Sequence, residues 1–258
     1  MRYTECLGLD PGDVAAMIGS GGKTSLLFRL AEENRAARRV LIAPTTKMLR
    51  PGRGEYDWDI SLCRGEPRSP AADGRGQQKE GGRAQFAPAE GIYLLHSGAP
   101  GEKITAPPMA RLAAACAEAD LALLECDGSR GLPLKGWAAY EPLVPSFVSV
   151  TVGVLPLWAL GQPVGPMTVH RVEEFCQLTG ALPDEPVSFA HMAAVIEHAE
   201  GLFQRAHGRR VLFLNSRQED TPPERAASLT EALDPAVRQS LTVLAGDIHR
   251  GTVWRILP

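Results

Sequence analysis

The chain has 258 residues and a net charge of -3 at pH 7, and 44% of its residues are hydrophobic. It is long enough for one large α/β domain or two smaller ones, and its charge balance gives no basic surface for nucleic acid. No apolar run reaches the length of a membrane span, and the N-terminus lacks the apolar segment of a secretory signal. The five cysteines are widely spaced without a C-x-x-C pair, which favours free thiols in a cytoplasmic protein.

The first predicted elements are a strand, a glycine-rich loop and a helix. The strand "VAAMI" leads into "GSGGKTS" at 19–25, and "LLFRLAEEN" follows with helical spacing. The usual phosphate-loop pattern has a glycine where this chain has Met17, so the loop is a shorter one that begins at Gly19. The order strand, loop, helix turns backbone N–H groups and a helix N-terminus toward an anion. The alternative is a tight turn with an N-capping hydroxyl.

We expect this loop to bind the phosphates of a nucleoside triphosphate. Its glycines allow the backbone to turn and to approach an anion without Cβ clashes. Lysine is suited to the β- and γ-phosphates as a flexible charge, and a threonine hydroxyl is suited to Mg²⁺. The predicted nucleotide-binding residues of the loop are Gly19, Ser20, Gly21, Gly22, Lys23, Thr24 and Ser25.

The next strand, "RRVLIA", ends in a polar cluster made of Thr45, Thr46 and Lys47. Ligands bind at the carboxyl ends of strands in open α/β sheets, and hydroxyls with an ammonium group suit a phosphate or its metal. We therefore add these three residues to the predicted cofactor site. Ordinary turn chemistry is the alternative interpretation.

The stretch 64–90 is dense in Gly, Pro and Arg and holds almost no apolar side chains. Such a segment buries too little surface to offset its ordering entropy, so we predict a mobile loop inside the domain.

An acidic strand end follows at "LALLECDGS", where Glu125 and Asp127 come after four apolar residues. Alternation along a strand places the two carboxylates on one face, so both can approach one Mg²⁺ together with Thr24. Solvated acids at the start of a turn are the alternative. Because the two acids repel each other on this interpretation, Asp127→Asn is expected to change the stability of the unliganded protein little, or to raise it slightly.

Two further pairs of charged residues attract attention. Lys135 and Glu141, in "GLPLKGWAAYEPLVP", could place charge beside the γ-phosphate, or could belong to a proline-rich loop that packs under aromatic side chains. His170 and Arg171 could supply a cation across the site, but a helix start on a solvated face is the preferred interpretation. His170 and Arg171 lie in a predicted small helical subregion at about 156–207, which we expect to cover one edge of the sheet.

Short runs rich in Val, Ile and Leu recur along the chain, and several are separated by stretches with helical spacing. This alternation predicts an α/β fold with a doubly wound, mostly parallel sheet of P-loop NTPase type and helices on both faces. We expect residues 1–258 to form a single domain. The predicted strands include "VAAMIGS", "RRVLIAP", "GIYLLHS", "LALLECD", "FVSVTVGV", "RRVLFLN" and "LTVLAGD".

The three polar clusters, in this order, resemble the YqeC-type family of selenium-dependent hydroxylase accessory proteins. The resemblance continues through "ECDGSRGLPLKGWAAYEPLVP", "VTVGVLPLWALGQPV" and "VHRVEEFCQLTG". It implies a P-loop NTPase that acts with molybdenum hydroxylases, or with the machinery that matures their cofactor. The family's motifs fall on four segments of this chain, at 19–25, 45–47, 125–128 and 132–135.

One departure from that family concerns the base of the nucleotide. Such proteins tend to carry an Asn-Lys/Gln-x-Asp stretch after the strand "RRVLFLN", like the guanine-reading element of GTPases. Here Asn215 is present, but Ser216 and Gln218 occupy the Lys/Gln and Asp positions. We therefore favour ATP over GTP.

The leading functional hypothesis is a Mg²⁺-dependent NTPase or NTP-dependent transferase with Lys23, Glu125, Asp127 and Lys135 as its catalytic residues. Phosphoryl transfer asks the protein mainly for positioning and electrostatic stabilisation, which these side chains can supply. One alternative is a nucleotide-binding or cofactor-binding carrier without turnover. Another is a small-molecule kinase, for which the sequence reveals no acceptor pocket.

Overall fold

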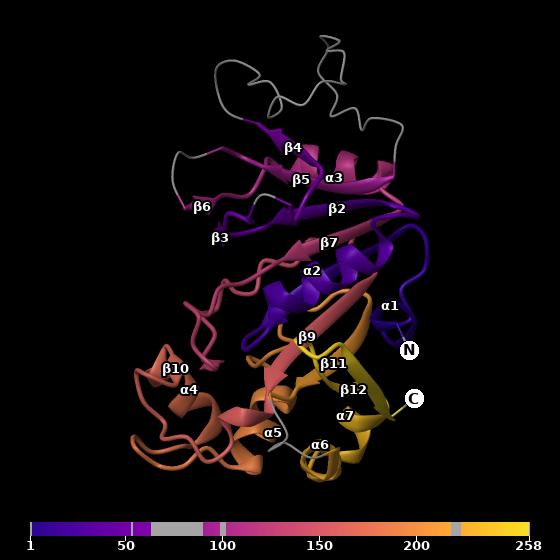
Figure 1. The fold of residues 1–258 in the computed structure, drawn as a ribbon. Coiled ribbons are helices and arrows are strands. Elements are labelled where there is room, and N and C mark those ends of the chain that lie inside the picture. The colour runs from indigo at the N-terminus through magenta and orange to yellow at the C-terminus, as the bar shows by residue number, and fades with distance from the viewer. Residues whose placement is uncertain (1, 53, 63–89, 99–101, 218–222, 258) are drawn as a thin grey trace.

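A computed structural model describes residues 2–52, 54–62, 90–98, 102–217 and 223–257. A nine-stranded sheet runs through the molecule in the order β13-β12-β11-β9-β1-β7-β2-β5-β4 (Figure 1). Its strands, in chain order, are β1 (Asp13–Gly19), β2 (Arg39–Pro44), β4 (Trp58–Ser61), β5 (Gly91–His96), β7 (Leu121–Glu125), β9 (Val150–Pro156), β11 (Arg209–Asn215), β12 (Thr242–Asp247) and β13 (Thr252–Leu257).

Every neighbouring pair in this sheet is parallel except β12 and β13. Strands β5, β7 and β9 are buried along their whole length, as expected where both faces of a parallel sheet are covered. The predicted α/β fold with a mostly parallel sheet is therefore confirmed. The edge strands β4 and β13 are not among the strands predicted from the sequence.

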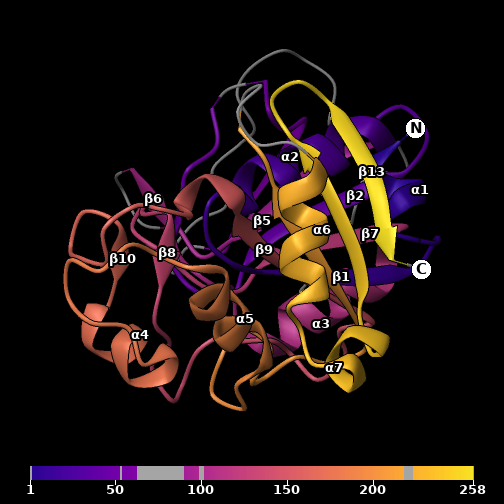
Figure 2. The same ribbon diagram turned by 90° about the horizontal axis from the view of Figure 1, so that it is seen from below.

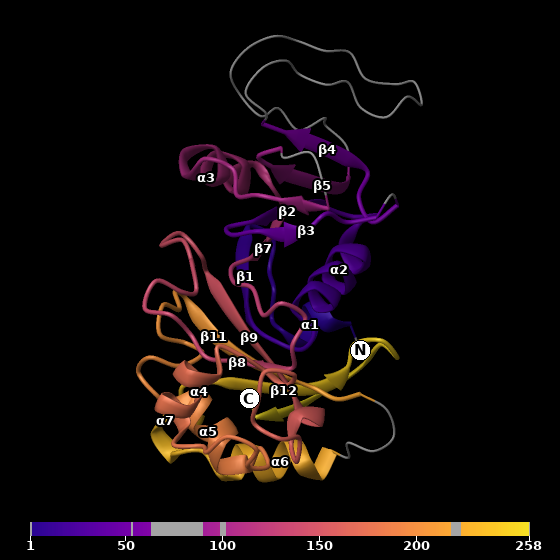
Figure 3. The ribbon, with the colours of Figure 1, turned by 90° about the vertical axis from the view of Figure 1, so that its left-hand side faces the viewer.

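Helices cover both faces of the sheet, and α2 and α3 lie on opposite sides of it in Figure 3. Two separate apolar clusters correspond to the two faces. The first face carries α1 (Tyr3–Cys6) and α2 (Lys23–Asn34). The second carries α3 (Met109–Glu118), α5 (Phe189–Glu197) and α6 (Pro223–Glu231), and the short α7 (Pro235–Gln239) follows α6.

The predicted helical subregion at 156–207 contains η1 (Leu157–Ala159), α4 (Val172–Thr179) and α5. It does not cover an edge of the sheet, because the buried α5 side chains Met192 and Ile196 pack within the core of one face. Next to α4, the two-residue strand β10 (Val169–His170) pairs in parallel with β8 (Leu134–Lys135). Figure 2 shows β8, β10 and α4 together on the side of the molecule away from both termini.

A second two-stranded sheet joins β3 (Met48–Leu49) to β6 (Lys103–Ile104). Of the predicted mobile loop at 64–90, residues 64–89 lie outside the described residues. Within the part of the chain that the structure describes, no helix has both the length and the apolar character needed to cross a membrane. The four cysteines described are free thiols.

Candidate functional site

The site forms where β1 and β7 end side by side. The two strands are parallel neighbours, and Met17 pairs with Glu125 in their register. This places the end of the glycine-rich loop, the start of α2 and the acidic strand end at the same edge of the sheet. This adjacency is what the predicted shared Mg²⁺ site requires, because acids after one strand and a phosphate loop after another serve one ligand only at a shared edge.

The loop has the backbone conformation that its glycines make possible. Gly19, Gly21 and Gly22 have φ values of 95°, 67° and 139°, a region that residues with side chains rarely adopt. A Cβ at Gly21 would lie 2.5 Å from the ring of Pro156. A Cβ at Gly22 would clash with the side-chain amide of Asn215. The loop therefore packs closely against the ends of β9 and β11, with α2 beginning at the next residue.

Lys23 turns back onto its own loop. Its ammonium group donates a hydrogen bond to the carbonyl oxygen of Gly19 at 2.6 Å and lies 3.3 Å from Oδ1 of Asp127. Lys23 is 5% exposed and Asp127 is fully buried. The predicted phosphate-binding lysine and the predicted acid thus form a buried ion pair.

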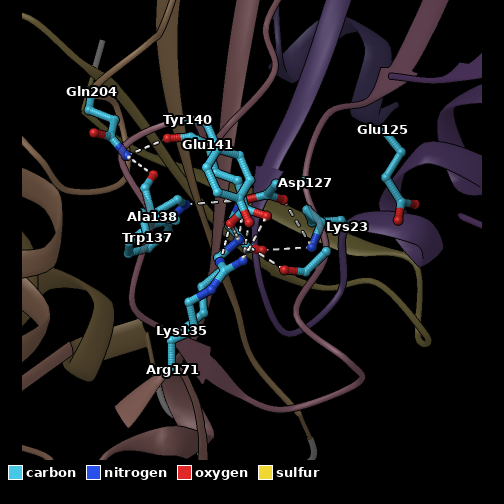
Figure 4. A network of polar contacts seen from close by, with 12 residues as sticks. Lys23, Glu125, Asp127, Lys135, Trp137, Ala138, Tyr140, Glu141, Arg171 and Gln204 are labelled. Atoms are coloured by element: carbon cyan, nitrogen blue, oxygen red, sulfur yellow. Dashed lines mark hydrogen bonds and ion pairs between the residues drawn. The ribbon is translucent and has the colours of Figure 1, made fainter. Parts of the chain in front are cut away.

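The two oxygens of Asp127 have different surroundings. Oδ2 accepts three hydrogen bonds, from the backbone N–H of Gly19 at 3.0 Å, Nζ of Lys135 at 3.2 Å and Nε1 of Trp137 at 3.1 Å. Oδ1 faces only Lys23, and no described residue donates a well-formed hydrogen bond to it. Figure 4 shows this carboxylate at the centre of a network of cations.

Glu125 and Thr24 form a second contact, between β7 and the first turn of α2. The hydroxyl of Thr24 donates to Oε2 of Glu125 at 2.7 Å, which leaves the lone pairs of the hydroxyl available to a cation. Burial raises the pKa of Glu125 above its usual value, and the charge of Lys23 and the Thr24 hydrogen bond offset part of that effect. Glu125 makes none of the contacts that join Asp127 to Lys135 in Figure 4.

Buried polar atoms without partners test whether this site suits a nucleotide and Mg²⁺. Among the described residues, seven buried side-chain atoms have no hydrogen-bond partner, and three of them belong to the predicted site: Oγ of Ser20, Oγ1 of Thr46 and Oδ1 of Asp127. Such atoms are uncommon in folded proteins and call for an explanation, which a bound ligand would provide. The described residues contain no group of three or more His, Cys, Asp or Glu side chains that could hold a metal ion by themselves. Two carboxylates and a hydroxyl fit Mg²⁺, which usually keeps water and phosphate ligands.

The cluster at the end of β2 is divided between different environments. Thr45 is buried, and its backbone N–H donates to the carbonyl oxygen of Glu125 at 2.9 Å. It also lines a pocket of about 440 Å³ together with residues 142–145 and 204–207, none of which belongs to the phosphate loop. Lys47 is exposed. The structure therefore brings Thr45 next to β7 and leaves Lys47 in solvent.

Lys135 and Glu141 lie inside the protein as an ion pair. Lys135 is 1% exposed, and its ammonium group donates to Oε2 of Glu141 at 3.0 Å and to the carbonyl oxygen of Gly128 at 2.9 Å. Arg171 forms an ion pair with Glu141 and donates to the hydroxyl of Tyr140. Burial alone would raise the pKa of Glu141, but Arg171 and Lys135 outweigh it and hold that pKa below its usual value.

The preferred interpretation of Arg171 as part of a solvated helix start is therefore wrong. Its side chain is 19% exposed and engaged with Glu141, although it does stand immediately before α4. His170 lies in β10, where burial and the nearby charge of Arg171 lower its pKa. No sequence pattern predicts the Arg171–Glu141 pair, because the two residues lie thirty positions apart in the chain.

Asn215, which the sequence associated with base recognition, contacts the phosphate loop directly. Its side-chain amide donates to the carbonyl oxygen of Gly21 at 2.8 Å. The backbone N–H of Ser216 donates to the carbonyl oxygen of Gly246 at 2.7 Å. Gln218, which bears on the choice of base, lies outside the described residues.

Comparisons with known proteins identify a family that this chain resembles over most of its length. A family model described as "YqeC protein" matches residues 15–173. The "Uncharacterized protein YqeC" of Escherichia coli (strain K12) is 32% identical over 248 residues, covering 92% of this chain and 88% of that protein. No solved structure matches the chain. The range matched by the family model contains the loop, the acidic strand end, Lys135, Glu141 and Arg171.

Proposed function

The chain belongs to the YqeC family, and we propose that it binds a nucleoside triphosphate with Mg²⁺ at the loop between β1 and α2 and hydrolyses it. One observation carries the proposal: Lys23, Thr24, Glu125 and Asp127 converge at the start of α2, beside buried oxygen atoms that lack hydrogen-bond partners. A helix N-terminus that follows three glycines with positive φ offers the phosphates backbone N–H groups as well.

Each residue has a distinct part in the proposed site. Lys23 exchanges its contact with Asp127 for the phosphate oxygens, where an ammonium group stabilises the charge that develops during phosphoryl transfer. Thr24 would hold the metal through its hydroxyl, which Glu125 keeps oriented. Asp127 would offer Oδ1 to the metal or to its water. When bound, Mg²⁺ neutralises phosphate charge and polarises the phosphoryl group.

The test is isothermal calorimetry with ATP and GTP, with and without Mg²⁺, followed by a phosphate-release assay. Lys23→Ala is expected to weaken ATP binding by about 10- to 150-fold, the usual worth of a charged hydrogen bond. Lys103→Ala, which removes an exposed lysine from β6, serves as the control and should leave affinity unchanged. Equal affinity of the wild type and Lys23→Ala would exclude the loop as the nucleotide site.

The second candidate is a carrier that binds nucleotide or cofactor without turnover. The buried Lys23–Asp127 pair favours it, because Lys23 must give up its carboxylate partner when phosphate binds, and such a change of partner can report that the site is occupied. Stoichiometric ATP binding without phosphate release, also in the presence of a partner enzyme, would favour this carrier over the hydrolase. The pocket of about 440 Å³ gives no support to a kinase, since none of residues 19–25 lines it.

The pathway is part of the same proposal and is supported by the family resemblance. We place the protein as an accessory factor for selenium-dependent molybdenum hydroxylases or for the maturation of their cofactor, with ATP favoured over GTP. A strain that lacks the protein should then produce the hydroxylase polypeptide in normal amount but with reduced activity. Full hydroxylase activity in that strain would argue against the pathway and leave the nucleotide site untouched.

A further inference from the structure

We propose that Lys135, Glu141 and Arg171 form a relay that positions the Asp127 carboxylate and couples it to the start of helix α4. The part of this proposal that concerns the metal rests on the proposed function, whereas the coupling itself does not. The relay consists of five alternating charges: Lys23, Asp127, Lys135, Glu141 and Arg171. Its residues come from the phosphate loop, the end of β7, β8, the loop after β8 and the residue before α4.

The first step is the asymmetry of Asp127. Three donors hold Oδ2, and Lys135 is the only charged one among them. With Oδ2 held in this way, the carboxylate cannot rotate freely, so Oδ1 stays directed toward Lys23. Lys135 and Trp137 therefore act as positioning residues: by binding Oδ2 of Asp127, they keep Oδ1 directed toward the phosphate loop.

The second step is the confinement of Lys135. Its ammonium group is surrounded by Asp127, Glu141 and the carbonyl oxygen of Gly128, and the side chain is almost fully buried. A buried ammonium group cannot compensate for a lost partner by turning to water. A change in the charge or position of Asp127 therefore shifts the ammonium group of Lys135 relative to Glu141. Arg171 forms an ion pair with Glu141 from the other side, so it is affected in turn.

The third step is the contact between the backbones of β8 and the start of α4. The N–H of Gly136 donates to the carbonyl oxygen of His170 at 2.8 Å. A Cβ at Gly136 would lie 2.7 Å from the carbonyl oxygen of Arg171, so the backbone after β8 contacts the backbone before α4 with no side chain between them. Arg171 itself has φ 62°, a left-handed conformation that a non-glycine residue keeps only when its surroundings hold it. A displacement of Lys135 is thus passed to α4 through both side chains and backbone.

The test uses hydrogen exchange measured residue by residue by NMR in the nucleotide-free protein. The reporters are the amide of Gly19, which binds Oδ2 of Asp127, and the amide of Phe175, which binds the carbonyl oxygen of Arg171. Arg171→Gln should speed exchange at Gly19 about tenfold, a common size for coupling between sites. The amide of Phe213 in β11 is the reference for global unfolding and should change by much less.

Two further variants separate the relay from a local effect. Glu173→Gln removes an exposed charge from the same turn of α4 and should leave Gly19 exchange unchanged. Arg171→Lys keeps the charge and should restore most of the protection at Gly19. In the opposite direction, Asp127→Asn should speed exchange at Phe175. If Arg171→Gln affects only its own neighbours, or if Glu173→Gln has the same effect, the relay is refuted.

The metal-binding part is tested separately by calorimetry. Arg171→Gln should reduce the gain in ATP affinity that Mg²⁺ provides about threefold to tenfold, and should leave affinity without Mg²⁺ unchanged. If the wild type binds no nucleotide, the proposed function fails, while the exchange experiment still decides the relay. If the wild type binds ATP with Mg²⁺ but Arg171→Gln changes neither exchange at Gly19 nor the Mg²⁺ effect, the relay fails and the function stands.

Discussion

Asp127→Asn is expected to destabilise the nucleotide-free protein by about 3 kcal/mol. The carboxylate lies 3.3 Å from Lys23 and 3.2 Å from Lys135, and all three side chains are buried. At an effective dielectric constant of about 20, each such pair gains about 5 kcal/mol before desolvation is counted. Removing one partner from a buried pair costs about 3–5 kcal/mol. We take the lower end because Lys135 keeps Glu141 and Lys23 keeps the carbonyl oxygen of Gly19.

Thermal unfolding without ligand measures this effect, and for a domain of this size the midpoint should fall by about 6 to 12 °C. The matched control is Glu125→Gln, which neutralises a buried acid two residues away. Because burial raises the pKa of Glu125, its ionised form is unfavourable in the folded protein, and the control should be as stable as the wild type or more stable. An Asp127→Asn variant with an unchanged or higher midpoint would refute the electrostatic reasoning.

Three other predictions concern the loop, pH and the metal. Gly21→Ala should cost about 1–3 kcal/mol in thermal unfolding, because its Cβ would meet the proline ring at the end of β9; Gly12→Ala, with positive φ but open space, should cost less. Burial alone would raise the pKa of Glu141, but Arg171 and Lys135 outweigh it and lower that pKa, so the ionised carboxylate stabilises the fold fully above the unfolded pKa of 4.5. The stability difference between wild type and Glu141→Gln should therefore shrink as the pH falls through the lowered folded pKa, as calorimetry at about pH 7 and about pH 3 can check. ATP and Mg²⁺ should each raise the affinity for the other about tenfold in titrations, since Lys23 leaves a carboxylate that the metal can then neutralise; independent binding would contradict this.

The central strands were predictable because their sequences are continuous apolar runs bounded by turn residues. β7 reads Leu-Ala-Leu-Leu and is buried along its length, as a strand covered on both faces must be. The edge strand β4, Trp58–Ser61, alternates between half-buried and exposed positions over only four residues, which is too short for a clear signal. The helical subregion was placed at an edge because nothing in its sequence reveals which face its apolar side chains cover.

The candidate side chains Lys23, Asp127 and Lys135 were all named from the sequence, but the ion pairs that join Asp127 to the two lysines were not. The register of β1 with β7 brings Glu125 to the edge where the loop begins, and Asp127, which follows the end of β7, contacts Gly19 and Lys23 of that loop. The expectation that Asp127→Asn would leave stability unchanged or raise it assumed that the neighbouring acid dominates the field at Asp127. Lys135 reverses that sign, because the chain turns back after Gly128 and inserts a lysine from β8. Such a return cannot be recognised from spacing alone.

The charges around Asp127 also explain how the site can exist both without ligand and, as proposed, with phosphate bound to Lys23. Without ligand, Lys23 and Lys135 both face the carboxylate, and the amount of uncompensated buried charge is small. If Lys23 turns to phosphate, Asp127 loses one cation on the Oδ1 side, which is where the proposed metal would enter. Lys135 remains on Oδ2 throughout, because Glu141 and Gly128 hold it there. In this arrangement one lysine exchanges partners while the other fixes the geometry, so the carboxylate is never buried without a counter-charge. A single lysine could not do both, because the side chain that leaves for the phosphate would also release Asp127 from its position.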